Sequence, residues 1–272
     1  MTSLIHPTAI IHPGAELDST VSVGPYAVIG DRVRIGAGTS IGAHVVIEGP
    51  TSLGRENVIF PGAAIGLESQ DKKIDGAPDR YVRIGDRNRI REFVTINRAT
   101  SAGEETVIGN DNLLMAYVHV AHNCELHNRI TISNAVSLAG HIVIDSGAVI
   151  GGMSGFHQFV HVGRNAMVGG MSRVERDVPP FMIVEGNPSR VRGLNLIGLK
   201  RSGLVDDETS TSLKEFKQAY RLLYRSELSL QDALAQLRQQ VKADTVAPLR
   251  DLLAFLEASI QPDRRGPVPG GR

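Results

Sequence analysis

Several residue types are scarce in this chain, and each scarcity excludes a class of protein. Cysteine occurs once in 272 residues, which excludes a framework of intrachain disulfides. Tryptophan is absent and aromatic residues make up 4% of the sequence, so aliphatic side chains must fill the core. The 29 basic and 29 acidic residues cancel, and this balance gives no reason to expect nucleic-acid binding.

Long apolar runs are also missing. No stretch approaches the ~18 consecutive apolar residues of a membrane-spanning helix, so we predict no integral membrane segment. Residues 1–7 lead directly into a repeat and lack the charged and apolar regions of a signal peptide. These features predict a cytoplasmic protein.

The chain does contain an aliphatic residue at nearly every sixth position from Ile5 to Val174. An α-helix needs apolar spacing near 3.6 and a lone strand needs spacing of 2, whereas a period of six is typical of a parallel β-helix of hexapeptides. Three successive repeats should form one coil of a triangular prism. The position four residues after each anchor is small or β-branched, and we expect it to face inward as well.

Two interruptions divide the repeats. Residues 66–83 and 97–107 are predicted to form loops on one face, where solenoids often bind ligands; Ala102 occupies the anchor position within the second. We assign residues 1–190 to the β-helix. Apolar stripes with helical spacing predict an α-helical C-terminal domain over residues 191–260, which would cover the last coil. Residues 261–272 are expected to be a disordered tail.

Histidines cluster in the second half of the repeats. The phase of the repeat places His119, His122 and His141 facing outward, and a coil of three repeats stacks His122, Gly140 and Gln158 on successive coils. An imidazole beside a glycine N–H suits a general base with an oxyanion donor, which acyl transfer to a hydroxyl requires.

Two side chains are candidates to orient the imidazole of His122. Asn123 is its neighbour in the sequence and Asp71 lies in the first loop; the sequence does not decide between them.

Three other interpretations are open. His119, His122 and His141 could bind zinc through three imidazoles, as γ-class carbonic anhydrases do on the same type of β-helix. Cys124 could be a nucleophile, although its inward phase favours a buried thiol. The repeats could also form a scaffold without enzymatic activity, which would leave the histidine cluster unexplained.

Motifs along nearly the whole chain resemble those of the acyl-(acyl carrier protein)–UDP-N-acetylglucosamine O-acyltransferases. They are Ile84-Gly-Asp-Arg-Asn-Arg-Ile-Arg-Glu92, Gly109-Asn-Asp-Asn-Leu-Leu-Met115, His119-Val-Ala-His122, Leu138-Ala-Gly-His141, Gly151-Gly-Met153, His157-Gln-Phe159, Asp177-Val-Pro-Pro-Phe181, Gly198-Leu-Lys-Arg201 and Ala219-Tyr-Arg-Leu-Leu-Tyr-Arg-Ser226. The resemblance implies a left-handed parallel β-helix and a homotrimer with active sites between subunits.

The reaction that this resemblance implies is the first step of lipid A biosynthesis. A 3-hydroxyacyl group moves from acyl carrier protein to the 3-hydroxyl of UDP-N-acetylglucosamine, and no cofactor is needed beyond the phosphopantetheine of the donor. The alternative within the pathway is the N-acyltransferase that acts on the UDP-3-O-acylated sugar. That enzyme usually carries an extra N-terminal domain, whereas the repeats here begin by Ile5.

The resemblance also implies roles for individual residues. His122 is the general base and the Gly140 N–H is the oxyanion donor. Contacts to the sugar, phosphates, nucleotide or donor arm are implied for Gln70, Asp71, Lys73, His119, His141, His157, Gln158, Asn195 and Arg201.

Acyl-chain length is implied to depend on Gly170 and on Met167 beside it. Because glycine leaves the slot open, we expect a long 3-hydroxyacyl chain of about fourteen carbons rather than about ten.

The chain departs from the family pattern at three positions. Asn123 stands where some members carry an acidic residue, and Ile197 and Ser202 stand where some carry Glu and Arg. Acyl carrier proteins are acidic, so we expect a basic docking surface near the junction with the helical domain. The candidates are Arg190, Arg192, Lys200 and Arg201.

Overall fold

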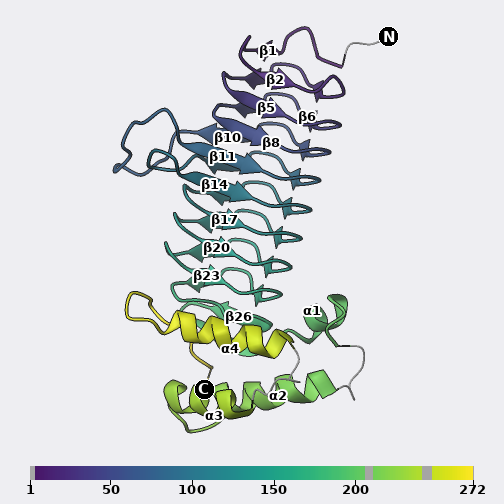
Figure 1. The fold of residues 1–272 in the computed structure, drawn as a ribbon. Coiled ribbons are helices and arrows are strands. Elements are labelled where there is room, and N and C mark those ends of the chain that lie inside the picture. The colour runs from purple at the N-terminus through teal and green to yellow at the C-terminus, as the bar shows by residue number, and fades with distance from the viewer. Residues whose placement is uncertain (1–3, 206–210, 241–246, 272) are drawn as a thin grey trace.

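The structure, a computed structural model, describes residues 4–205, 211–240 and 247–271. Figure 1 shows a straight column of stacked coils with helices at its C-terminal end. Each coil contributes one short strand to each of three sheets, and within each coil the chain turns sharply between the strands.

The strands of the three sheets are as follows. The first sheet runs β1 (Ile10–Ile11), β4 (Val28–Ile29), β7 (Val46–Ile47), β10 (Ala64–Leu67), β13 (Thr95–Asn97), β16 (His119–Val120), β19 (Ser137–Leu138), β22 (Gly155–Phe156) and β25 (Arg173–Val174). The second runs β2 (Glu16–Leu17), β5 (Val33–Ile35), β8 (Thr51–Leu53), β11 (Tyr81–Ile84), β14 (Glu105–Ile108), β17 (Glu125–Leu126), β20 (Val143–Ile144) and β23 (His161–Val162). The third runs β3 (Ser22–Val23), β6 (Ser40–Ile41), β9 (Val58–Ile59), β12 (Arg89–Ile90), β15 (Leu113–Leu114), β18 (Thr131–Ile132), β21 (Val149–Ile150), β24 (Met167–Val168), β26 (Met182–Gly186) and β27 (Ser189–Leu194).

The register of the strands confirms the predicted coil. Ile11 pairs with Ile29 and Ile29 with Ile47, so each anchor stacks on the anchor three repeats further along the chain. From Val23 to Val174 the aliphatic anchors are buried, as is the second inward column that includes Cys124. Ile5 remains partly exposed because no coil packs on the N-terminal side of it.

The two interruptions form loops that protrude on the same side of the column (Figure 1). They are shorter than predicted, because β10 extends to Leu67, β11 begins at Tyr81, β13 ends at Asn97 and β14 begins at Glu105. Ile84 pairs with Ile108, which lies four repeats further along the chain instead of three. One whole repeat is thus looped out, and Ala102 is exposed at its tip rather than acting as an anchor.

The loops are joined to each other by hydrogen bonds. The N–H of Ala102 donates to Asp75 Oδ2 at 2.7 Å, and the N–H of Gly103 donates to the carbonyl of Asp79 at 2.7 Å. In the first loop, the Arg80 guanidinium is buried and paired with Glu68. The two insertions therefore form a single hydrogen-bonded unit beside the coils.

Helices close the C-terminal end. They are α1 (Leu196–Arg201), α2 (Thr211–Tyr224), α3 (Leu230–Gln240) and α4 (Ala247–Ser259). The antiparallel β26–β27 hairpin runs on to Leu194, so the first helix starts slightly beyond the predicted boundary at residue 191. Phe181 of the last coil packs on Phe216 of α2, with ring centroids 5.1 Å apart, and this contact joins the helices to the β-helix core.

The expected disordered tail is instead packed against the end of the β-helix over the described residues 261–271. The N–H of Val268 donates to the carbonyl of Asp177 at 2.8 Å, and Val268 is 1% exposed. The buried carboxylate of Asp177 accepts hydrogen bonds from Ser259 and Arg264. A buried charge needs such partners, and the sequence could not show that the tail supplies them.

Within the described residues, no helix combines the length and apolar character needed to cross a membrane.

Candidate active site

His122 lies two residues beyond β16, where the chain turns out of the first sheet. Its ring leaves the prism as the phase predicts, yet the residue is only 9% exposed. The ring therefore faces out of the prism but is shielded from solvent, because residues of the first insertion lie beside it and those of the second hold its neighbour Asn123.

Both candidates for orienting this ring contact it, on opposite nitrogens. Asn123 Oδ1 lies 2.9 Å from His122 Nδ1, and Asp71 Oδ2 lies 3.6 Å from His122 Nε2. With Nδ1–H donated to Asn123, the lone pair of Nε2 is free to accept a proton. Asp71 lies where it can stabilise the imidazolium that results.

Gly140 stacks against this imidazole as predicted. A Cβ added at Gly140 would lie 2.3 Å from His122 Cε1 and 2.5 Å from Nε2, so the ring occupies the space of a side chain. Gly140 is buried, and its N–H makes no hydrogen bond to any residue that the structure describes. An unpaired buried amide is costly, and a substrate oxygen would satisfy it.

Two further histidines border His122. His141 meets it edge to face with centroids 5.2 Å apart, and stacks on Phe159 at 4.7 Å. His119 Nδ1 lies 2.7 Å from Thr95 Oγ1. Burial, and secondarily the nearby His122, lowers the pKa of both His119 and His141. Neutral imidazoles of this kind can donate and accept hydrogen bonds to a polar substrate.

A cavity of about 390 Å³ extends along the first sheet from His119 to His157. His157 Nε2 lies 3.2 Å from an Arg265 amino group, and Gln158 is exposed at the next turn. A second cavity of about 360 Å³ is lined by Gln70 and Thr95. His119 and His157 thus line one cavity, and Gln70 lines another.

Lys73 takes part in the turn that begins at Asp71 and fixes the position of its carboxylate. Its backbone N–H donates to Asp71 Oδ1 at 2.9 Å, and its side chain is exposed. This bond leaves Asp71 Oδ2 facing His122.

Asn195, for which the resemblance implies a substrate contact, has a structural role in this chain. It is buried at the N-terminus of α1, where Oδ1 accepts from the N–H of Gly198 and Nδ2 donates to the carbonyl of Asn165, both at 2.9 Å. Its amide is therefore used to cap the helix. Arg201 ends α1 and is exposed, and no described hydrogen bond or ion pair joins it to the histidine cluster.

The predicted acyl slot is formed by two glycines on successive coils. Gly170 stacks on Gly152, whose carbonyl would lie 3.2 Å from a Cβ at Gly170. Met167 is half-buried in β24, and Met171 beside the slot is exposed. Neither glycine carries a side chain, and a Cβ at Gly152 would likewise lie close to a backbone carbonyl, 3.1 Å from that of Asn134.

Two alternatives lose support from the geometry. Within the described ranges of this chain, no three His, Cys, Asp or Glu side chains converge as a metal site. Cys124 is fully buried with its thiol directed at the carbonyl of Ala139, and burial raises its pKa to about 12. A thiol in this state is a poor nucleophile.

Sequence reasoning missed two residues of the second insertion. The N–H and hydroxyl of Thr100 each donate to Asn123 Oδ1 at 3.2 Å, and Asn123 Nδ2 donates to Glu104 Oε2 at 2.8 Å. The one signal in the sequence that pointed to these residues was that the second insertion keeps the phase of the repeat and adds one whole repeat beside the histidines.

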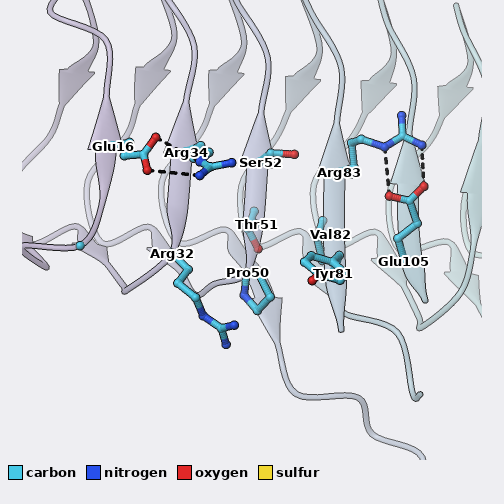
Figure 2. A pocket seen from close by; sticks show the side chains of 11 residues that line it. Glu16, Arg32, Arg34, Pro50, Thr51, Ser52, Tyr81, Val82, Arg83 and Glu105 are labelled. Carbon is cyan, nitrogen blue, oxygen red and sulfur yellow. Dashed lines mark hydrogen bonds and ion pairs between the residues drawn. The ribbon is translucent and has the colours of Figure 1, made fainter. Parts of the chain in front are cut away.

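A separate cavity of about 380 Å³ lies on the second sheet, away from the histidines. Figure 2 shows Arg34 paired with Glu16 and Arg83 paired with Glu105 across adjacent strands. Because each of these guanidinium groups is already neutralised, the cavity is a poor site for an anion.

An imidazole against the backbone of a glycine, on a hexapeptide β-helix, is the arrangement expected of an acyltransferase. The comparisons agree. The family model described as bacterial transferase hexapeptide (six repeats) matches residues 15–49, and that described as Udp N-acetylglucosamine O-acyltransferase; Domain 2 matches residues 177–268.

Relatives cover almost the whole chain. The acyl-[acyl-carrier-protein]–UDP-N-acetylglucosamine O-acyltransferase of Verminephrobacter eiseniae is 51% identical over 259 residues, 93% of this chain and 97% of the relative. The enzyme of that name from Gloeothece citriformis is 59% identical over 212 residues, 78% of this chain and 74% of the relative. The structure of the Francisella novicida UDP-N-acetylglucosamine acyltransferase matches with a TM-score of 0.90 at 34% identity, over 98% of this chain and 95% of that one.

The chain belongs to the acyl-(acyl carrier protein)–UDP-N-acetylglucosamine O-acyltransferase family and is an acyltransferase. Its fold is the left-handed parallel β-helix with a small helical C-terminal domain.

Proposed function

We propose that the chain transfers a 3-hydroxyacyl group from acyl carrier protein to the 3-hydroxyl of UDP-N-acetylglucosamine, the first step of lipid A biosynthesis. The observation that carries the proposal is the contact between the imidazole of His122 and the backbone of Gly140, which leaves no room for even a Cβ. Base and oxyanion donor thereby lie side by side, and Ala139, the residue before Gly140, lines a largely apolar cavity together with His119 and His157.

The reaction follows from these positions. His122 Nε2 removes the proton from the sugar 3-hydroxyl as that oxygen attacks the thioester carbonyl. The Gly140 N–H stabilises the oxyanion of the tetrahedral intermediate. The intermediate collapses with cleavage of the C–S bond, and the imidazolium returns its proton to the departing phosphopantetheine thiolate. Asn123 holds Nδ1 throughout, and Asp71 faces the charge that forms on the ring.

We propose that the substrates bind along the first sheet, where one cavity is lined by His119 and His157 and a second by Gln70 and Thr95. Asp71, His119, His141 and His157 are proposed to bind the sugar and phosphates, with Gln70, Lys73 and Gln158 at the exposed rim. No cofactor is required, because the donor carries its own phosphopantetheine arm. Arg201 and Lys200 remain candidates for contacts with acyl carrier protein, and this donor places the reaction in the cytoplasm.

We further propose a homotrimer. One corner of the column exposes a large apolar side chain on many of its coils: Tyr26, Phe93, Tyr117, Met153 and Met171. Exposed apolar side chains that recur along one corner are typical of a subunit interface.

Replacement of His122 by Ala tests the proposal. We expect kcat to fall by roughly 10²–10⁴-fold, the usual contribution of a positioned base. His127→Ala is the matched control, because His127 is paired with Glu125 on another sheet. Rates with UDP-N-acetylglucosamine and with the UDP-3-O-acylated amino sugar separate the O-acyltransferase from the N-acyltransferase. Near wild-type activity of the His122 variant would contradict the assignment of the base.

A further inference from the structure

The second insertion reaches the catalytic cluster through Asn123. Glu104 lies at the end of this loop and accepts a hydrogen bond from Asn123 Nδ2 at 2.8 Å. The amide oxygen of the same side chain lies 2.9 Å from His122 Nδ1. A continuous line of hydrogen bonds thus runs from a carboxylate through an amide to the imidazole.

The carboxylate of Glu104 determines the orientation of the side-chain amide of Asn123. An ionised carboxylate only accepts hydrogen bonds, so the NH₂ group of Asn123 must face Glu104. The amide oxygen then faces His122, and the N–H and hydroxyl of Thr100 donate to that same oxygen. An acceptor on Nδ1 requires that this nitrogen carry the proton, which leaves Nε2 as the base.

Glu104 also brings a negative charge that an asparagine beside the histidine lacks. The charged and titratable groups around His122 are Asp71 from the first loop, His119 and His141 from the coils, and Glu104 from the second loop. The charge of Glu104 reaches this cluster, since it opposes the lowering of the pKa of His141. Hydrogen-bonded chains of this kind polarise one another.

We propose that Glu104 is a positioning residue for acyl transfer: through Asn123 it fixes the tautomer of His122 and stabilises the imidazolium. The inference rests on the proposed role of His122 as the general base. It assigns a catalytic contribution to an insertion loop that otherwise only covers the site.

Glu104→Gln removes the charge and retains an amide oxygen that can still accept from Asn123. We expect kcat to fall about 10-fold, comparable to the loss of an outer residue that orients a catalytic ligand. KM for UDP-N-acetylglucosamine should be unchanged. The acid limb of the pH–rate profile should move to lower pH, because the imidazolium loses a nearby negative charge. Glu105→Gln is the matched control, since Glu105 is paired with Arg83 instead.

A second pair of variants separates this role from mere support of the loop. Asn123→Asp alone places two carboxylates side by side and should lower kcat. Combined with Glu104→Gln, it puts one carboxylate directly on Nδ1, and we expect kcat and the acid limb to return towards wild type. Loop support alone would give additive losses instead of this recovery.

The outcomes distinguish the two proposals. An active His122→Ala variant removes the base and this inference with it. If the His122→Ala variant is inactive but the Glu104→Gln variant keeps its kcat and pH profile, the inference about Glu104 is overturned and the proposed function stands. A slower Glu104→Gln variant with an unmoved acid limb and no recovery in the double variant also overturns it.

Discussion

Gly140→Ala is the sharpest single test of the site, because one added methyl group meets the proposed base. The new Cβ would lie 2.3 Å from His122 Cε1, whereas ordinary contact begins at 3.4 Å, so the ring must move by about 1.1 Å (3.4 − 2.3). This movement would break the 2.9 Å hydrogen bond between Nδ1 and Asn123. A misplacement of about 1 Å costs roughly 10²-fold in rate, so we expect at least that loss in kcat.

The substitution leaves the proposed oxyanion donor in place. Alanine keeps the backbone N–H, and Gly140 does not have a positive φ, so the backbone itself tolerates a side chain. Overpacking in a buried site costs about 1–3 kcal/mol, which a thermal melt would detect without loss of the fold. The rate loss would therefore report the displaced imidazole.

The assay compares initial rates of transfer from acyl-(acyl carrier protein) to UDP-N-acetylglucosamine, alongside thermal melts. Gly193→Ala is the control, because a Cβ there meets nothing within 4 Å. In a His122→Ala background, Gly140→Ala should cost little more, since the ring that it displaces is gone. A near wild-type rate for the single variant, or the same 10²-fold loss in both backgrounds, would refute the reasoning.

Two further predictions concern specificity and pH. Gly170→Met should shift the donor preference towards shorter acyl chains by filling the open surface above Gly152; unchanged ratios of kcat/KM across donors of different length would place the limit elsewhere. Burial lowers the pKa of His141 below its ordinary value of 6.5, so the unfolded chain takes up this proton first and stability should be lost as pH falls through about 6.5. His141→Gln should flatten that part of the curve of melting temperature against pH, and an unaltered slope would show that His141 is not responsible.

The β-helix could be predicted because the residue type at each sixth position shows by itself whether that position is buried. Each aliphatic anchor reports its own burial, and the register of Ile11 on Ile29 follows from counting. Gly140 beside His122 was predictable for the same reason, since both lie on the regular coils and are separated by three whole repeats.

The features that could not be predicted depend on contacts made by loops, helices and the tail, which do not follow the six-residue repeat. The burial of His122 comes from two loops whose path the repeat does not specify. Asn195 matched a family motif, but its role as a helix cap depends on where α1 begins. The packing of the tail depends on the buried carboxylate of Asp177, whose partners lie more than eighty residues further along the chain.

The stacking of the coils also determines how the molecule comes apart. Each coil touches only the coils above and below it, so it gains its stability from its neighbours rather than from a shared centre. The C-terminal end is covered by helices and by the returning tail, whereas the anchors Ile11 and Leu17 of the first coil are only partly buried. Unfolding is therefore easiest at the N-terminal end and proceeds from one coil to the next. The coils that hold His122 and Gly140 lie far from that end, so local opening of the first coils would leave the proposed site intact.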